Sequence, residues 1–228
     1  MKKYLREKLL KKRDIISLRK RMEKGALIIK RLFRMSEFKK AESILFYASF
    51  KSEVDTINCL QAAITHGKRI SLPKVDKKRR RLMLYEIKDT SELAPGCMGI
   101  PEPAILRGRK TALKDIDVVV VPGAGFDIYG NRLGYGAGYY DKLLSGIRDW
   151  GLGIREQKNK NFTKSQTRTP KPFLIALAFE EQIIPKVPNE GHDIKIDKIV
   201  TEKRIVNCKT EGSRMQGVKG SSGGVNYF

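Results

Sequence analysis

Residues 118–144 read VVVVPGAGFDIYGNRLGYGAGYYDKLL, and this segment contains the features that decide the fold. Its four consecutive valines are typical of a short strand that is buried on both faces of a parallel sheet. A glycine-rich stretch follows, and we expect a helix from about residue 138 to residue 145. In open α/β sheets, ligands bind beyond the carboxyl ends of the strands, so the glycine-rich stretch lies where a binding site is expected.

Strand-like and helix-like patterns alternate on both sides of this segment. The N-terminal third has helical spacing of its apolar residues, with Gly25 separating two helices. A further helix has Asp55 or Thr56 near its N-cap and ends at Gly67, and residues 90–116 are predicted to be loop and short helix. Further strands are predicted at residues 43–50, 69–75, 82–87, 173–179 and 197–206. The alternation favours a three-layer α/β/α fold with a mostly parallel central sheet and the N-terminal helices packed on it.

We expect a single α/β domain over residues 1–206, because this part of the chain contains no internal repeat. Residues 155–172 are polar and basic, and we expect a mobile loop there. Residues 207–228 contain five glycines and no periodicity, which predicts a disordered Gly-rich tail.

The composition argues against several classes of protein. No apolar run approaches the ~18 residues needed to cross a bilayer, and charges interrupt every apolar stretch near the N-terminus. We therefore expect a cytoplasmic protein with no membrane partner. Cys59, Cys97 and Cys208 are far apart and form no CxxC pair, which argues against a disulfide framework and against a structural zinc site.

The chain is strongly basic, with 47 Lys and Arg against 25 Asp and Glu and a net charge of +22. Residues 1–40 supply 16 of the basic residues and only four acidic ones, and the run KKRRR occupies residues 77–81. Such a balance attracts polyanions without specifying one, and a lysine-rich composition needs no partner at all. A nucleic-acid-binding protein on the same scaffold is an alternative. The sequence has no recognisable RNA-recognition or zinc motif, and aromatic residues are not interleaved with the basic ones.

The glycine-rich stretch has the parts of a phosphate site. Glycines adopt positive φ and expose N–H groups to an anion, and the following helix directs its positive end to the same place. Arg132 adds a forked donor that matches phosphate, and Asp141, one turn inside the helix, can hold Mg²⁺. The pattern is neither a Walker loop nor a dinucleotide fingerprint. Gly134, Gly136 and Gly138 are also compatible with a tight strand-to-helix turn that binds nothing.

The segment PGAGFDIYGNRLGYGAGYYDKLL resembles the motif of the 5-formyltetrahydrofolate cyclo-ligases, which are also called methenyltetrahydrofolate synthetases. The family pattern is close to PG-x-x-FD-x-x-G-x-RLG-x-G-x-GYYD, and nearly every fixed position is present. The resemblance covers about residues 2–206, because four other segments are also similar to the family: KKYLR, FYASFKSEVDT, IALAFEEQII and GHDIKIDKIVTE.

The resemblance implies an enzyme that uses ATP and Mg²⁺ to convert 5-formyltetrahydrofolate into 5,10-methenyltetrahydrofolate, with ADP and phosphate as the other products. Transfer of the terminal phosphoryl group to the formyl oxygen allows attack by N10, loss of phosphate and ring closure. This chemistry depends on positioning and charge stabilisation more than on a covalent nucleophile. The second alternative is a relative of the sugar-phosphate isomerases that does not use ATP.

The resemblance also implies roles for individual residues. Glu53, Ala48 and Tyr139 are expected to bind the folate, and Arg132 and Tyr139 are expected to be catalytic. Asp141 and Asp193 are the expected Mg²⁺ ligands. The expected partners are therefore the folate substrate and ATP, with no specific nucleic acid, in a monomer or a homodimer. The residues expected to bind ATP are Lys2, Lys3, Tyr4, Leu5, Arg6, Arg132, Leu133, Gly134, Tyr135, Gly136, Ala137, Gly138, Tyr139 and Tyr140.

Overall fold

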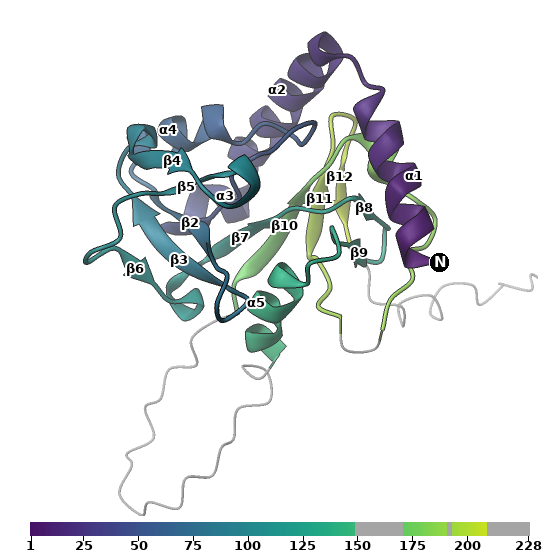
Figure 1. Cartoon of the computed structure of the whole chain (residues 1–228). Coiled ribbons are helices and arrows are strands. Elements are labelled where there is room, and N and C mark those ends of the chain that lie inside the picture. Colours follow the sequence, from purple (N-terminus) through teal and green to yellow (C-terminus); the bar gives the residue numbers. More distant parts are fainter. Residues whose placement is uncertain (149–170, 191–192, 209–228) are drawn as a thin grey trace, which may run out of the picture.

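The computed structural model describes residues 1–148, 171–190 and 193–208. Over these ranges the main sheet has eight strands in the order β12-β11-β10-β7-β1-β2-β3-β6 (Figure 1). The pairs from β11 through β10, β7 and β1 to β2 are parallel, and the outer pairs are antiparallel, so the predicted mostly parallel central sheet is confirmed. The strands are β1 (Ser43–Leu45), β2 (Arg69–Asp76), β3 (Arg81–Ile87), β6 (Lys110–Thr111), β7 (Val118–Val121), β10 (Phe173–Leu177), β11 (Lys198–Val200) and β12 (Ile205–Asn207).

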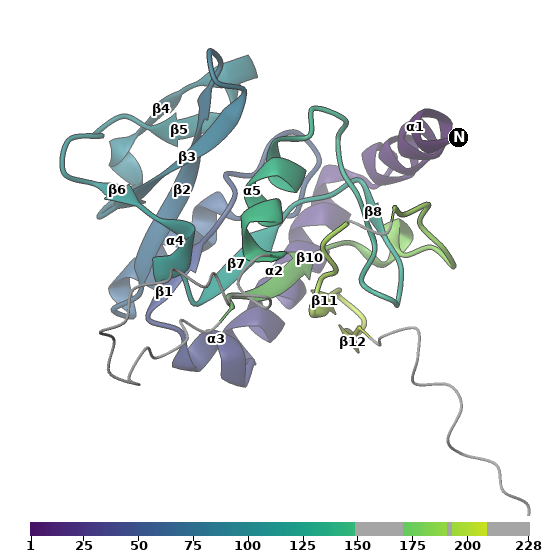
Figure 2. The ribbon, with the colours of Figure 1, turned by 90° about the horizontal axis from the view of Figure 1, so that it is seen from below.

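Helices cover both faces of this sheet, which confirms the three-layer prediction. Figures 1 and 2 show α5 on one face, and α2 and α3 pack with α4 against the other. The helices are α1 (Lys2–Asp14), α2 (Leu18–Arg34), α3 (Ser36–Lys40), α4 (Ile57–Thr65) and α5 (Tyr139–Arg148), with the 3₁₀ turns η1 (Thr90–Glu92), η2 (Cys97–Gly99), η3 (Leu113–Asp115) and η4 (Glu180–Gln182). None of the helices in the described ranges is long and apolar enough to cross a membrane.

The four valines of β7 explain why this strand is apolar throughout. Val118 and Val120 belong to the core beneath α2, α3 and α4, whereas Val119 and Val121 belong to the core beneath α5. All four side chains are at most 2% exposed. Successive side chains of a strand point to opposite faces, so a strand between two helical layers buries every position.

The predicted break at Gly25 is wrong, because Gly25 lies buried inside α2. The two N-terminal helices separate earlier, where the Ser17 side chain accepts a hydrogen bond from the backbone N–H of Lys20 and caps α2. Glycine inside a helix costs about 1 kcal/mol relative to alanine. Burial of Ile28 and Leu32 on the same helix offsets this cost.

The strand predicted for residues 43–50 is too long, because β1 ends at Leu45. The Thr56 hydroxyl donates to the carbonyl of Tyr47 (2.6 Å) and accepts from the N–H of Ser49 (3.0 Å). These bonds hold residues 47–49 at the start of α4. Thr56 is also the N-cap residue of α4, as predicted.

Two further predictions are corrected by short strands. Residues 197–206 form a hairpin, β11 and β12, because the Thr201 hydroxyl accepts from the N–H groups of Lys203 (3.2 Å) and Arg204 (3.0 Å) in a turn that lacks Gly and Pro. Residues 90–116 contain strand as well as loop and 3₁₀ turn. There β6 joins the main sheet, and β4 (Leu93–Pro95) pairs with β5 (Pro101–Pro103).

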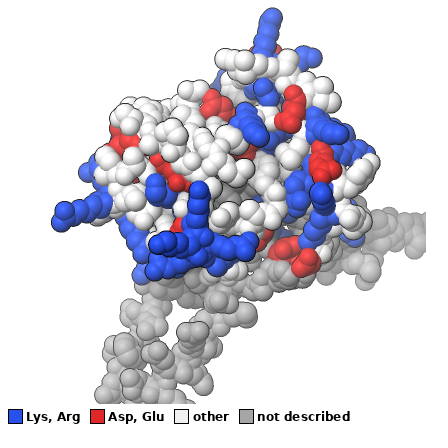
Figure 3. All heavy atoms as spheres, viewed as in Figure 1, with Lys and Arg blue, Asp and Glu red and all other residues white. Residues whose placement is uncertain are grey.

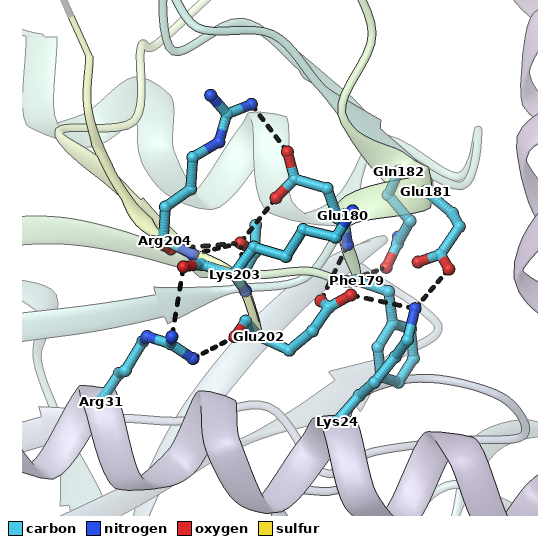
Figure 4. A network of polar contacts seen from close by, with 10 residues as sticks. Lys24, Arg31, Phe179, Glu180, Glu181, Gln182, Glu202, Lys203 and Arg204 are labelled. Carbon is cyan, nitrogen blue, oxygen red and sulfur yellow. Dashed lines mark hydrogen bonds and ion pairs between the residues drawn. The ribbon is translucent and has the colours of Figure 1, made fainter.

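A network of polar contacts holds the last strands against α2 (Figure 4). Lys24 pairs with Glu181 and with Glu202 (2.9 Å), and Arg31 donates to the backbone carbonyls of Glu202 and Lys203. The N–H of Glu180 donates to the Glu202 carboxylate (3.0 Å). The network therefore joins α2, η4 and the β11–β12 turn. The predicted loop at 155–172 and the predicted tail lie almost wholly outside the described residues.

Candidate functional site

The glycine-rich stretch forms an exposed loop between β9 (Arg132–Leu133) and α5. Gly136 (φ +104°) and Gly138 (φ +71°) have the positive φ values that side chains other than glycine rarely adopt. The loop leads directly into the N-terminus of the ten-residue α5. Free backbone N–H groups and the positive end of the helix dipole therefore meet at this loop, as an anion site requires.

Asp127 fixes the segment that precedes this loop by hydrogen bonds. The sequence analysis assigned Asp127 no role. Its buried carboxylate accepts from the backbone N–H groups of Tyr129 (3.0 Å), Asn131 (3.0 Å) and Val187 (2.8 Å). It also accepts from the Asn131 side-chain amide (2.9 Å). The signal was Asp127 three residues before Gly130, a spacing that is typical of a turn in which the Asp side chain accepts backbone N–H groups. The first half of the motif is thus a rigid base for the second half.

Arg132 is paired with one of the two expected metal ligands. Its side chain is only 6% exposed and pairs with Asp141, and it donates to the carbonyl of Pro122 (3.2 Å). Burial lowers the pKa of the Arg132 guanidinium, and the negative charges of Asp141 and Asp193 oppose that effect. Of the two carboxylates, Asp141 contacts the guanidinium directly. Asp193 lies in a segment that is fixed to the motif by a bond from the Asn189 amide to Asn131 Oδ1 (3.0 Å).

Mg²⁺ fits this arrangement better than a metal with a full protein cage. No group of three or more His, Cys, Asp or Glu that could hold a metal occurs among residues 1–148, 171–190 and 193–208. Mg²⁺ is commonly bound by one or two carboxylates together with phosphate oxygens of the substrate. Asp141, which is 63% exposed, and Asp193 supply that number of carboxylates.

Helix α1 supplies a second set of contacts to the loop. Arg6 Nε donates to the carbonyl of Gly134 (2.7 Å), and a Cβ placed on Gly136 would lie 3.3 Å from Arg6 Nη1. Lys2 pairs with Glu190 (3.0 Å) in the segment that contains Asp193. The structure therefore brings Lys2 and Arg6 to the site.

The other residues that were expected to bind ATP lie in different surroundings, some packed in a core and some exposed. Leu5 and Leu133 pack in a small core around Leu9 and contribute no polar group. Tyr4 is 71% exposed, and Lys3 and Ala137 are also exposed. A phosphate can reach the backbone of the loop, but the side chains of these residues do not point toward one common place.

Glu53 lies next to the glycine loop although it is far away in the sequence. One carboxylate oxygen accepts from the Tyr135 hydroxyl, and the other accepts from the N–H of Phe50 (2.9 Å). Burial raises the pKa of Glu53, whereas these two hydrogen bonds lower it. Ala48, which is buried, comes from the same segment after β1. The expected folate residue and the expected phosphate loop are therefore in direct contact.

Two tyrosines begin α5 beside Arg132. Tyr139 is half-buried. The guanidinium of Arg132 lies 6.0 Å from the ring centre of Tyr140, whose hydroxyl is buried without a hydrogen-bond partner in the described part of the chain. Burial raises the pKa of Tyr140. A buried hydroxyl without a partner is costly and marks a place where a ligand group can bind.

A cavity of about 690 Å³ lies between α2 and α4 and reaches Glu53. Its volume falls in the range of small-molecule sites. Its walls combine the apolar face of α2 with polar side chains near Glu53. The lining residues include Leu18, Met22, Ala26, Ile29 and Phe33 of α2, and Ser49, Lys51, Asp55, Asn58 and His66 from the 49–66 region.

Comparison with known proteins shows the family. The family model described as the 5-formyltetrahydrofolate cyclo-ligase family matches residues 1–202. The chain belongs to this family. The mouse 5-formyltetrahydrofolate cyclo-ligase is 27% identical over 206 residues, which are 88% of this chain and 93% of the mouse protein. The Escherichia coli K12 protein of the same name is 26% identical over 195 residues, 85% of this chain and 96% of its own length.

Solved structures of cyclo-ligase relatives have the same fold. An NMR structure of the Aquifex aeolicus 5,10-methenyltetrahydrofolate synthetase is 29% identical and has a TM-score of 0.71, with 95% of this chain and 99% of that chain covered. The Mycoplasma pneumoniae 5,10-methenyltetrahydrofolate synthetase is 19% identical with a TM-score of 0.62, over 88% of this chain and 98% of that one. The second similarity supports the fold alone.

Proposed function

We propose that this protein is a 5-formyltetrahydrofolate cyclo-ligase, which forms 5,10-methenyltetrahydrofolate at the expense of ATP. The observation that supports this most directly is the contact between Tyr135 of the glycine loop and Glu53. A loop suited to phosphate and a carboxylate suited to a pterin thus lie within one hydrogen bond of each other. The terminal phosphoryl group and the formyl group have to meet at such a junction.

The reaction is a phosphoryl transfer followed by ring closure. The formyl oxygen attacks the terminal phosphorus of ATP and ADP leaves, which converts a poor leaving group into phosphate. Attack of N10 on the activated formyl carbon then closes the five-membered ring, and loss of phosphate and of the N10 proton gives the methenyl group. We propose that Arg132 and the backbone N–H groups of the loop bind the negative oxygens while charge develops on them.

Glu53 would hold the pterin end of the folate. A carboxylate accepts two parallel hydrogen bonds from an amino-pyrimidine edge, and Glu53 is anchored by Phe50 for that purpose. We propose that Ala48 adds a small apolar surface beside it and that Tyr139 borders both the folate and ATP. We propose that the cavity between α2 and α4 accommodates part of the bound folate, because Glu53 lines it.

Asp141 and Asp193 would hold Mg²⁺ next to the phosphates. The bound metal would reduce the charge repulsion between the phosphates and the formyl oxygen. Arg132 positions Asp141 through their ion pair. Asp193 is positioned by its own carboxylate, which accepts the N–H of Glu190 (2.9 Å).

An absorbance assay for methenyl-folate tests the proposal. With 5-formyltetrahydrofolate, ATP and Mg²⁺ together, we expect product to form and ADP to appear in equal amounts. Omission of any one of the three should abolish both signals. ADP release that does not require the folate, or isomerase activity without ATP, would rule the proposal out.

The basic surface does not by itself require a second function. Figure 3 shows Lys and Arg side chains gathered over the β2–β3 turn and α5, where residues 77–80 are exposed and the Lys142 ammonium donates to the carbonyl of Arg79 (3.3 Å). We propose that nucleic acid binds there only weakly and without sequence preference, so filter retention should fall steeply as salt rises. Sequence-selective, salt-resistant retention would favour the nucleic-acid alternative.

The cellular location and the oligomeric state are part of the same proposal. We propose a cytoplasmic enzyme that acts as a monomer or a homodimer. A relative from Arabidopsis thaliana, 29% identical over 202 residues, carries the name "5-formyltetrahydrofolate cyclo-ligase, mitochondrial".

A further inference from the structure

Arg13, in the last turn of α1, is a buried cation that the proposed reaction does not yet use. It is 4% exposed. Its Nε donates to the Ser52 hydroxyl (2.9 Å), and its Nη1 donates to the Tyr135 hydroxyl (2.6 Å). A buried charge is costly unless other groups compensate for it, so a buried arginine of this kind has a specific task.

Arg13 reaches carboxylates only through hydroxyl groups in the part of the chain that the structure describes. The Ser52 hydroxyl donates onward to Asp14, and the Tyr135 hydroxyl donates onward to Glu53. The Arg13 charge also acts on Glu53 and lowers its pKa, against the larger effect of burial. Arg13 and Glu53 are therefore the two ends of one chain of hydrogen bonds.

The chemistry of arginine fixes the direction of this chain. A guanidinium has donors and no acceptor, so the Tyr135 oxygen must accept from Arg13. The hydroxyl has a single proton, and Glu53 is the nearer of its two acceptors, since the carbonyl of Gly123 lies 3.4 Å away. This direction favours the ionised carboxylate, the form that a folate amino group and ring N–H require as an acceptor.

Arg6 and Arg13 are spaced so that one face of α1 contacts the glycine loop twice. They are seven residues apart, which is close to two helical turns and about 10 Å along the axis. Arg6 binds the carbonyl of Gly134, and Arg13 binds the next residue, Tyr135. One rigid helix therefore fixes both the phosphate side of the loop and the side that faces Glu53.

We propose that Arg13 is a positioning residue that couples the two substrate sites through Tyr135. We call the hydrogen-bond chain from Arg13 through Tyr135 to Glu53 the relay. A folate that binds Glu53 fixes the relay and with it the glycine loop. ATP then binds to a loop whose ordering cost has already been met, and the same holds in the reverse order. This inference rests on the proposed function, because it assigns ATP to the loop and folate to Glu53.

The test measures the affinity for a non-hydrolysable ATP analogue with Mg²⁺, in the presence and the absence of saturating 5-formyltetrahydrofolate. We expect the folate to tighten binding of the analogue about tenfold in the unmodified protein, a typical coupling between two sites. In Tyr135→Phe and in Arg13→Lys the ratio should fall to about one. The KM for folate should rise more than kcat falls, because the relay positions substrates and does not react.

Tyr129→Phe is the matched control, since it removes a hydroxyl from the same motif outside the relay. We expect it to retain the coupling ratio and both kinetic constants. The double variant Arg13→Lys with Tyr135→Phe should lose no more coupling than either single variant, because both changes break one chain. Circular dichroism on each variant checks that the fold is kept.

The outcomes separate the two proposals. If the unmodified protein forms no methenyl-folate, the proposed function fails. If it forms the product but shows no coupling, or if Tyr135→Phe and Arg13→Lys retain the ratio, the proposed function stands and the relay is refuted. Additive losses in the double variant also refute the relay.

Discussion

Replacing Arg132 with alanine is the most direct test of the phosphate assignment. The side chain is 6% exposed, and it is fixed by the carbonyl of Pro122 and by Asp141. It therefore needs little reorganisation when charge develops on the transferred phosphoryl group. Removal of one such preorganised donor costs about 2–4 kcal/mol of transition-state stabilisation. The expected fall in kcat/KM is thus about 30- to 900-fold.

The measurement is the rate of methenyl-folate formation at several ATP concentrations. Arg132→Lys keeps the charge but not the planar fork, so its rate should fall between those of the alanine variant and the unmodified enzyme. Arg107, which is exposed and outside the site, gives the matched control Arg107→Ala, with an unchanged rate. A folded Arg132→Ala protein that keeps more than about a third of the original kcat/KM would refute the assignment.

Three further changes have expected outcomes. Gly136→Ala forces a side chain onto φ +104° and toward Arg6, so the KM for ATP should rise about tenfold or more, measured by the same assay. Asp141→Asn should raise the Mg²⁺ concentration needed for half-maximal rate at least several-fold, and EDTA should stop the unmodified enzyme until Mg²⁺ is restored. Burial raises the pKa of Glu181, but its bonds to Lys24 outweigh this and leave the pKa below its usual 4.5. The pair therefore stabilises the fold above about pH 4.5 and less as the pH falls. Because solvent screens the partly exposed Glu181, Lys24→Met should lose only about 0.5–1 kcal/mol in urea unfolding at pH 7, and clearly less near pH 3.

The strands and the loop that follow simple local rules were predictable from the sequence. The valine run, the apolar strand at 173–179 and the two strands flanking the basic turn all appear where expected. The errors arise where tertiary contacts override local preference. Gly25 stays helical because α2 is packed, and Thr201 makes a turn without glycine or proline.

The site was predictable only in part, since the resemblance identified positions but not their contacts. Glu53 and the loop were expected to share a site, whereas the Tyr135 hydroxyl that joins them was not. Arg13 was hidden among the many basic residues of α1. Its spacing from Leu9 and Ile16 places it on the buried face of the helix, and this was the available signal.

The two arginines of α1 constrain how this helix can change during evolution. Each residue of a helix turns the next by about 100°, so one residue inserted between Arg6 and Arg13 would swing one of them away from the loop. Substitution of the exposed lysines between them leaves that phase intact. We therefore expect natural variants of this helix to differ at its exposed positions, while Leu9 stays apolar and the length between the two arginines is preserved. The β2–β3 turn, which carries no such constraint, should tolerate insertions.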